Sequence, residues 1–414
     1  MALRGWTWDA AVGPAGLGDR PLLEALSAAL PDETVEAAIA ATGTRERRRR
    51  LLPTRLVVTL VVAMGLWAAE SVRHALASVV EGWRDGGAGE RSGWRLPDNA
   101  AIVRARRRAG ARLFRVLFHA VAGPLATPDT AGAFLGGLRL MALDGTTLDV
   151  ADTPENARAF GRPTTYRGRG AFPQLRVLAL IETGTHALCD AVLRPYRSGE
   201  TGAALRLLRS VGPGMLLLWD RNFHSHAMVS RTLARGAHFL GRTKANIVLR
   251  PLEVLGGGSF LARIYPTPYA RSREVGGTVV RVIEYALDTP AGPGREKYRL
   301  ITSLLDERAF PAEQLAAAYH ERWEIETTLD EVKVHQWAHP RPLRSKHPRG
   351  VVQELYGLLL AHLAIRTLMH QAALREGLDP DRLSFTGALR VLRRAIPRAQ
   401  RTRLELFPLF ASDS

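Results

Sequence analysis

Short apolar runs of strand length alternate with helical stretches through the middle of this chain, and two of these runs end at an aspartate. In chain order the segments read as three strands, a helix, a strand, a helix and a strand: Leu138–Leu143, Leu175–Ile181, Ala187–Leu193, Thr201–Ser210, Met215–Trp219, Phe223–Arg235 and Ala237–Gly241. This mixture predicts an α/β domain built around one sheet. Asp144 follows the first run and Asp220 follows the fourth. Because sites in such sheets form at the carboxyl ends of strands, we expect the two acids to meet there.

The sequence on either side has a different texture. The first 128 residues carry helical patterns, including a short amphipathic stretch at Leu22–Leu30, a Gly-rich linker at Gly86–Gly93 and a basic helix that starts near Arg104. Residues 244–299 hold short β runs between Gly turns. We therefore predict an all-α domain at residues 1–128, an α/β core split between 129–243 and 300–375, a β-rich insertion at 244–299 and a basic helical tail at 376–414.

The charge of the chain is strongly positive. Its 414 residues carry 57 Lys and Arg against 40 Asp and Glu, a net charge of +17, which indicates a polyanionic partner such as nucleic acid. The excess lies at the ends, with +6 in residues 1–128, +7 in residues 341–414 and only +4 between them. Only four of the basic residues are lysines, so the codon bias of a GC-rich genome explains the arginine excess as well as selection does.

The densest chemical signal lies on a helix that we expect to open at Pro311. In the stretch YHERWEIETTLDEVK, a helical wheel puts Tyr319, Arg322, Glu326 and Lys333 on one strip about 60° wide. This strip borders the apolar stripe of the helix, so we expect Glu326 to lie at the edge of the core. An ordinary salt-bridged helix explains the spacing of the Arg322–Glu326 pair, but not the match with two aspartates at strand ends.

Three carboxylates that converge repel one another unless cations neutralise them. Asp144, Asp220 and Glu326 are hard oxygen ligands of the kind that select Mg²⁺ or Mn²⁺. Two such ions about 4 Å apart activate a water or a 3′-hydroxyl and stabilise the leaving oxygen in phosphodiester transfer. The Arg and Lys on the same strip would then hold phosphates of the substrate.

These motifs together resemble the DDE transposases of the insertion-sequence-4 family. The family hallmark is Tyr, two residues, Arg, three residues, Glu, six residues, Lys, and it is complete in this chain. The sequence around the first acid (LDGTTLDVADTPENARAFG), WDRNF around the second and RLITSLLD before the third resemble the neighbouring family blocks. The helical start is similar to the N-terminal domain of this branch, so the resemblance covers nearly the whole chain.

The resemblance implies a ribonuclease H-like catalytic core, preceded by an all-α DNA-binding domain and interrupted by a β-rich insertion. It implies Asp144, Asp220 and Glu326 as catalytic metal ligands, with two Mg²⁺ or Mn²⁺ ions. It also implies cut-and-paste transposition, in which the element's end is nicked, closed as a hairpin, reopened and joined to target DNA. By the same resemblance, Tyr319, Arg322 and Lys333 contact DNA phosphates near a flipped base. The partners would be the terminal inverted repeats, target DNA and a second copy of the chain in the synaptic complex.

Several other signals are weaker. Asp149 and Asp152 follow the first acid, and Asp330 lies near the strip and is the main rival of Glu326. The zinc-like residues His224, His226, His238 and Cys189 match no known ligand spacing. Trp323 and Trp337 are candidates to stack on a flipped base, although core packing is the simpler expectation for both.

The chain has one cysteine, which excludes an internal disulfide framework and favours a reducing compartment. Its longest apolar run, Leu56–Ala69, has 14 residues, whereas a membrane span needs roughly 20. We therefore expect a cytoplasmic protein without a membrane partner. Two alternatives to a transposase remain open: a metal-dependent nuclease or resolvase on the same fold, and a DNA-binding protein derived from a transposase.

Overall fold

The computed structural model describes residues 29–48, 50–85, 95–165, 168–244, 246–288, 295–337 and 341–402. Most of the helix expected at Leu22–Leu30 and the whole Gly-rich linker at Gly86–Gly93 lie outside the described residues.

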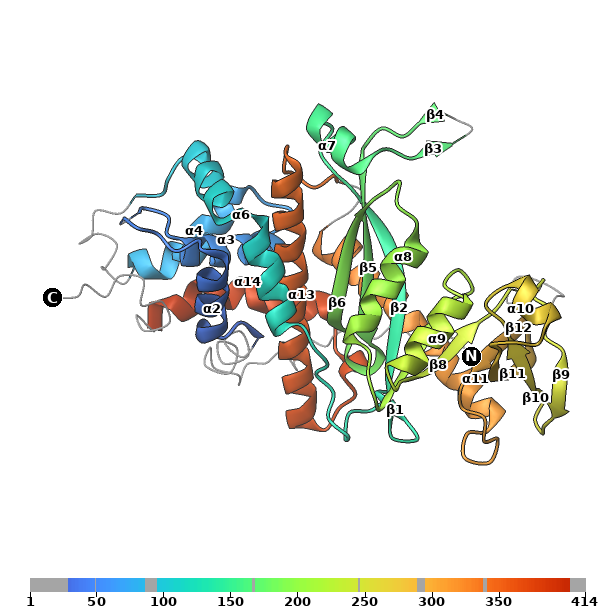
Figure 1. Cartoon of the computed structure of the whole chain (residues 1–414). Coiled ribbons are helices and arrows are strands. Elements are labelled where there is room, and N and C mark those ends of the chain that lie inside the picture. Colours follow the sequence, from blue (N-terminus) through green and yellow to red (C-terminus); the bar gives the residue numbers. More distant parts are fainter. Residues whose placement is uncertain are drawn as a thin grey trace.

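One mixed sheet forms the centre of the molecule (Figure 1). Its core strands lie in the spatial order β6 (Ala187–Pro195), β5 (Gln174–Glu182), β2 (Leu138–Asp149), β7 (Met215–Trp219) and β8 (His238–Arg242). The first three are antiparallel, whereas β2, β7 and β8 run parallel. When these five core strands are numbered along the chain, their spatial order is third, second, first, fourth and fifth. This order and these directions are those of a ribonuclease H-like core, as the sequence predicted.

The strands predicted after residue 244 extend the same sheet. They are β9 (Pro251–Val254), β10 (Ser259–Ile264), β11 (Thr278–Asp288) and β12 (Arg295–Thr302), each antiparallel to its neighbours. β12 pairs with β8, so the insertion joins the core without a break in the sheet. The domain boundaries given above stay a prediction.

Each face of the sheet has its own hydrophobic core, because successive strand residues point to opposite sides. On β2, Met141 and Leu143 pack with α8 (Glu200–Leu207) and α9 (His226–Ala234), whereas Leu140 and Ala142 belong to the larger core on the other face. This second core is shared with the helices.

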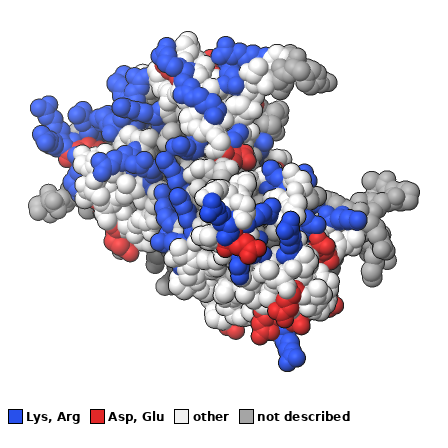
Figure 2. Space-filling view, turned by 45° about the vertical axis from the view of Figure 1, so that its right-hand side comes forward, with Lys and Arg blue, Asp and Glu red and all other residues white. Residues whose placement is uncertain are grey.

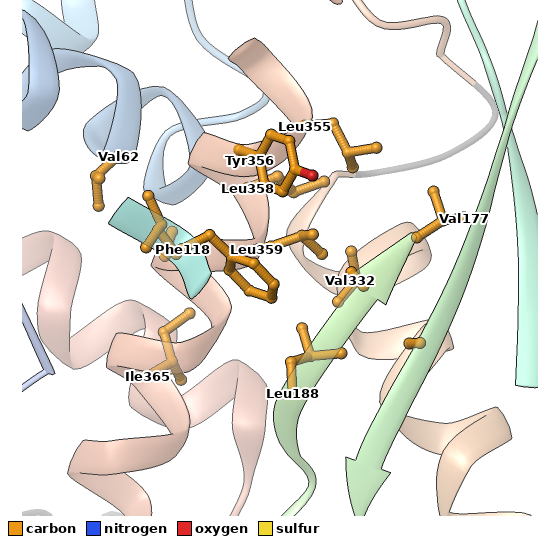
Figure 3. Close-up of a cluster of buried hydrophobic side chains, with 14 of the residues drawn as sticks. Val62, Phe118, Val177, Leu188, Val332, Leu355, Tyr356, Leu358, Leu359 and Ile365 are labelled. Carbon is orange, nitrogen blue, oxygen red and sulfur yellow. The ribbon is translucent and has the colours of Figure 1, made fainter. Parts of the chain in front are cut away.

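A layer of helices covers the second face. It consists of α2 (Asp32–Thr42), α3 (Thr54–Leu66), α4 (Val72–Asp85), α6 (Asn99–Val121), α13 (Pro348–Glu376) and α14 (Phe385–Thr402). In Figure 3, α13 residues such as Leu359 lie between Phe118 of α6 and the strand residues Val177 and Leu188. Helices from the two ends of the chain therefore pack together on one face of the sheet.

α13 is the one described helix that is long and apolar enough to cross a membrane by length and composition. However, 89% of its apolar window is buried inside the protein, as expected for the central helix of a folded core.

The shorter elements complete the fold: β1 (Phe134–Leu135) beside β2, α7 (Pro154–Phe160), the ribbon β3 (Thr164–Thr165) and β4 (Gly168–Arg169), and α10 (Pro268–Ser272).

The helix expected to run on from Pro311 is not continuous. The chain forms α11 (Ala312–His320), then α12 (Trp323–Asp330), then a π-helix, η4 (Glu331–Gln336). Between α11 and α12 the backbone bonds shorten to i→i+3, as in the bond from the Arg322 amide to the Tyr319 carbonyl at 3.1 Å. The assumption of a uniform 100° per residue was therefore wrong across this segment.

Candidate active site

Asp144 and Asp220 lie side by side because of the register of β2 and β7. Leu143 pairs with Trp219 in the parallel ladder, and each aspartate is the next residue of its strand or chain. One expectation was wrong: β2 does not end at Asp144, because it continues to Asp149 as the partner of β5. Only its pairing with β7 ends there. Asp144 is therefore held on a strand that is still hydrogen-bonded on its other side.

The third carboxylate reaches the same face of the sheet. Asp144 continues the alternation of Leu140 and Ala142, so it points to the face covered by the helices. α12 packs against β2 on this face and carries Glu326. Ile325 and Leu329, on the same helix as Glu326, are buried in the shared core and fix the rotation of α12.

The charges of these groups act on one another. Burial raises the pKa of Asp144 to about 6, and repulsion from Glu326 and Asp220 adds to the rise. The amide of Gly145, which donates to Asp144 Oδ1 at 2.8 Å, and the guanidinium of Arg322 oppose it. The three carboxylates therefore lie near enough for their charges to act on one another.

Arg322 lies beside these acids and is almost completely buried. It donates from Nη2 to Glu326 Oε1 at 3.2 Å, and its guanidinium stacks near the ring of Tyr319, 5.8 Å from the centroid. Burial lowers the pKa of Arg322, but Tyr319, Asp220, Glu326 and Asp144 outweigh this and raise it. The cation is therefore permanent and is held among the carboxylates.

Tyr319 completes this group. Its side chain is buried, and burial raises the pKa of its hydroxyl to about 12, with Asp220 adding to the rise. In the described part of the chain, Nε of Arg322 has no hydrogen-bond partner, and the Tyr319 hydroxyl has none apart from its interaction with the Arg322 side chain. Both atoms are buried, and buried polar atoms are normally satisfied, so their lack of partners is unusual.

The wall behind Asp220 is tightly packed. Trp219 is fully buried and stacks on Phe239, with ring centroids 5.1 Å apart. Gly241 lies beside Trp219 in the parallel register, and a Cβ at Gly241 would clash with the indole ring. The glycine therefore makes room for the tryptophan that precedes Asp220.

Lys333 is the one residue of the predicted strip that has no contact with the others among the described residues. It lies on η4 and is partly exposed, one turn past the end of α12. Because π-helical geometry differs from that of an α-helix, the helical wheel does not apply to Lys333, and its role in binding DNA stays a prediction.

The other acids considered as metal ligands do not join the three carboxylates. Asp149 accepts a hydrogen bond from Gln174, and Asp152 pairs with Arg162. Asp330 is exposed. Among the described residues, the zinc-like set around His224 forms no group that could hold a metal.

Two residues near the site were missed or misjudged. Arg242 ends β8, one position past Gly241, and its charge acts on the hydroxyl of Tyr319. The signal that could have identified Arg242 is its position as a basic residue at the carboxyl end of a strand parallel to β7. The expectation of core packing for Trp323 was wrong, because this side chain is 51% exposed and stacks with Arg322. Trp337 is buried, as expected.

The donor set fits hard divalent cations. Three carboxylates come from different elements, and burial, with smaller contributions from Glu326 and Asp220, disfavours the charged form of Asp144. A divalent ion would supply the missing positive charge.

The chain was compared with known proteins. The family described as "Transposase DDE domain" matches residues 135–364, and "Insertion element 4 transposase N-terminal" matches residues 20–119. The transposase InsG of insertion sequence element IS4 from Escherichia coli K12 is 28% identical over 387 residues, 91% of this chain and 84% of InsG. InsZ of the same strain, which is also named as a transposase, is 29% identical over 244 residues, 57% of this chain and 78% of InsZ.

A solved piggyBac transposase synaptic complex with hairpin DNA aligns over 93% of this chain and 82% of that chain, with 13% identity and a TM-score of 0.47. This likeness is too distant to support a fold assignment. The assignment rests instead on the strand order and the family match. The DDE domain match alone covers more than half of the chain. This chain therefore belongs to the DDE transposases, enzymes that use divalent metal ions, in the branch that carries the insertion element 4 N-terminal domain.

Proposed function

We propose that this transposase excises an insertion sequence from DNA and joins it to a new site, with Asp144, Asp220 and Glu326 as its catalytic metal ligands. The observation that carries the proposal is the register that places Asp144 beside Asp220, with Glu326 on the helix that packs against β2 on the same face of the sheet. Burial raises the pKa of Asp144, and the charges of Glu326 and Asp220 add to the rise. When bound there, two Mg²⁺ ions would activate the attacking oxygen and stabilise the leaving oxygen.

The chain's own residues have complementary tasks in this proposal. Arg322 presents a buried, permanent cation to a DNA phosphate, and the Tyr319 hydroxyl donates a hydrogen bond to the same group. Trp323 offers an exposed aromatic face beside them for a flipped base. Lys333 contacts the phosphate backbone further along the end.

The proposal extends to the partners and the course of the reaction. The substrates are the terminal inverted repeats of the element and a target duplex, and cleavage proceeds through a hairpin on the element's end. Two copies of the chain act together in the synaptic complex, in the cytoplasm of the bacterial cell. The resemblance to the insertion-sequence-4 family supports these points.

The test uses purified protein, Mg²⁺ and DNA that carries the element's own terminal inverted repeats. We expect nicked, hairpin and joined products from the wild type. Asp144→Asn, Asp220→Asn and Glu326→Gln should each lower cleavage by at least a thousandfold and leave end binding nearly unchanged.

The alternatives predict different products. Cleavage without any joined product would favour a nuclease or resolvase, and binding without cleavage would favour a DNA-binding derivative. Cleavage at the wild-type rate by any one of the three variants would remove that residue from the proposed site.

A further inference from the structure

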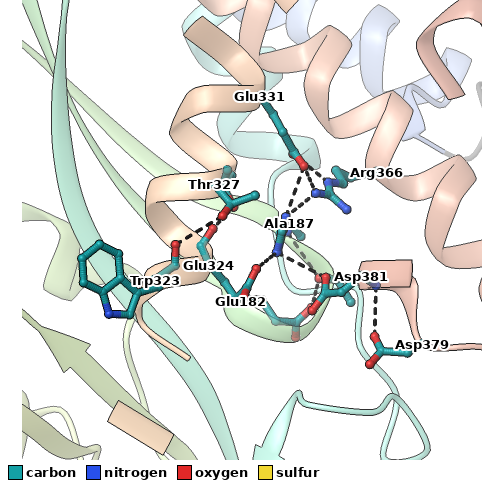
Figure 4. A network of polar contacts seen from close by, with 12 residues as sticks. Glu182, Ala187, Trp323, Glu324, Thr327, Glu331, Arg366, Asp379 and Asp381 are labelled. Atoms are coloured by element: carbon teal, nitrogen blue, oxygen red, sulfur yellow. Dashed lines mark hydrogen bonds and ion pairs between the residues drawn. The ribbon is translucent and has the colours of Figure 1, made fainter. Parts of the chain in front are cut away.

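A second group of ionisable side chains lies around His186, outside the site described above. His186 ends the turn between β5 and β6 and is 2% exposed (Figure 4 shows the surrounding network). Its partners come from α12, η4, α13 and the short 3₁₀-helix η5 (Pro380–Arg382). All four segments lie far along the chain from His186 and meet at this one imidazole.

The Nε2 atom of His186 faces two carboxylates. It is 2.7 Å from Glu324 Oε2 and 3.2 Å from Asp381 Oδ1. One ligand atom from each of the three residues lies within 4.8 Å of the other two. Donor atoms around a tetrahedral Zn²⁺ are about 3.3–3.6 Å apart, so small side-chain shifts suffice to fit an ion between them.

The charges around His186 do not balance among the described residues. Glu324, Glu331 and Asp381 bring three negative charges to the cluster, and Arg366 brings one positive charge. Uncompensated charge in a partly buried cluster is costly. A proton on His186 would leave one net negative charge, whereas a divalent cation would neutralise the cluster.

The other ring nitrogen of His186 has two neighbours. Its Nδ1 lies beside Nη2 of Arg366 and 3.4 Å from Glu331 Oε1, and Glu331 is held in turn by His362 Nε2 at 3.0 Å and by Arg366. A metal at Nε2 would place the ring proton on Nδ1, where Glu331 would accept it, and Arg366 would then pair with Glu331 alone.

We propose that His186, Glu324 and Asp381 bind one zinc-class divalent cation, separate from the site of Asp144, Asp220 and Glu326. An imidazole nitrogen with two carboxylate oxygens favours Zn²⁺ over Mg²⁺, which prefers oxygen ligands alone. The ion would tie α12 to the β5–β6 turn and to η5. Because Glu324 is two residues before Glu326, this tie would fix the helix that carries the third catalytic acid.

The test measures zinc in the full chain without DNA, so it does not depend on the proposed transposition. The double variant Asp144→Asn, Glu326→Gln serves as background, because it removes the carboxylate site as a source of bound metal. After dialysis against buffered Zn²⁺, elemental analysis should find about one zinc per chain. Adding His186→Gln or Asp381→Asn should lower the zinc affinity at least tenfold, and Glu331→Gln should lower it by 10- to 100-fold.

His370→Gln is the matched control. His370 is also buried on α13, but it binds Thr130 Oγ1 at 3.2 Å and lies outside the cluster. Zinc binding should be unchanged in this variant. Should His186→Gln fail to fold by circular dichroism, the partly exposed Asp381→Asn carries the test. Background protein that retains no more zinc than its His186→Gln form would overturn the proposal, as would an equal loss in His370→Gln.

Discussion

At the scale of single residues, the site is defined by how burial and neighbouring charge act on a few groups. Asp144 is the clearest case, since burial and the two other acids raise its pKa while Gly145 and Arg322 oppose the shift. The pKa of Arg322 is also raised, because the same acids favour its positive charge more strongly than burial disfavours it. The site is therefore an arrangement of mutually dependent charges, and a bound cation would change the protonation of Asp144.

The shifted pKa of Asp144 gives a prediction on pH. A carboxyl group whose pKa is higher in the folded state contributes stability below its ordinary pKa, and this is lost as the pH rises through about 6. In metal-free protein, Tm should therefore fall between pH 4 and pH 7. Metal binding requires the ionised form, so affinity for Mn²⁺ should rise up to tenfold per pH unit below about pH 6 and level off above it.

Titration calorimetry with Mn²⁺ and thermal melts between pH 4 and pH 8 check both expectations. Asp144→Asn should make the fall in Tm smaller in metal-free protein, while the contribution of Asp381, whose pKa burial also raises to about 6, should remain. A Mn²⁺ affinity that stays constant from pH 5 to pH 7 would contradict a raised pKa at Asp144.

At the scale of elements, close backbone approaches hold the helices against the sheet. α3 and α13 touch at a pair of glycines: a Cβ on Gly65 would lie 2.8 Å from the Ala361 Cβ, and a Cβ on Gly357 would clash with the carbonyl of Val61. Gln336 of η4 bonds to the Leu358 carbonyl of α13 at 2.9 Å. The catalytic segment is thus anchored to α13, which itself packs on the N-terminal helices.

Gly357→Ala should destabilise the protein by about 1–3 kcal/mol, because the added methyl group forces α3 and α13 apart. The matched control is Gly202→Ala in α8, where a Cβ meets nothing within 4 Å. That change should stabilise the protein by about 0.5–1 kcal/mol through helix propensity. Denaturant unfolding curves measure both, and equal effects at the two positions would argue against close packing at Gly357.

At the scale of the whole molecule, the basic residues and the proposed catalytic acids lie in different parts of the architecture. The described parts of the two basic ends of the chain form the helical layer, and the sheet with its acids lies beside it (Figure 1). On the face in Figure 2, Lys and Arg gather over the upper and left parts, with Asp and Glu mostly toward the lower edge. α6 contributes exposed arginines at positions 104, 107, 108, 112 and 115.

This arrangement predicts which arginines bind DNA. Removing the charge of Arg104, Arg107 and Arg112 should lower the salt dependence of DNA affinity by about 2–3 in the slope of log K against log salt. Arg206 and Arg231 are exposed on α8 and α9, on the opposite face of the sheet, and provide the control. Fluorescence anisotropy at several salt concentrations measures the slopes. An equal change in the control variants would mean that α6 is not the contact surface.

Much of the site was predictable from local patterns. Two apolar runs that end at an acid, together with the spacing from Tyr319 to Glu326, led to the residues that the fold brings together. Lys333 was predicted from the same helical wheel and stays a prediction, because η4 changes the helical pitch before Lys333 is reached.

The sequence by itself determined the α/β core and the meeting of Asp144 with Asp220, because periodicity and strand ends are local properties. Only the tertiary structure decided the break between α11 and α12, the exposure of Trp323 and the cluster around His186. His186 meets Glu324 and Arg366 across 138 and 180 residues of chain. No local pattern encodes such contacts, since they arise only when the helical layer closes over the sheet.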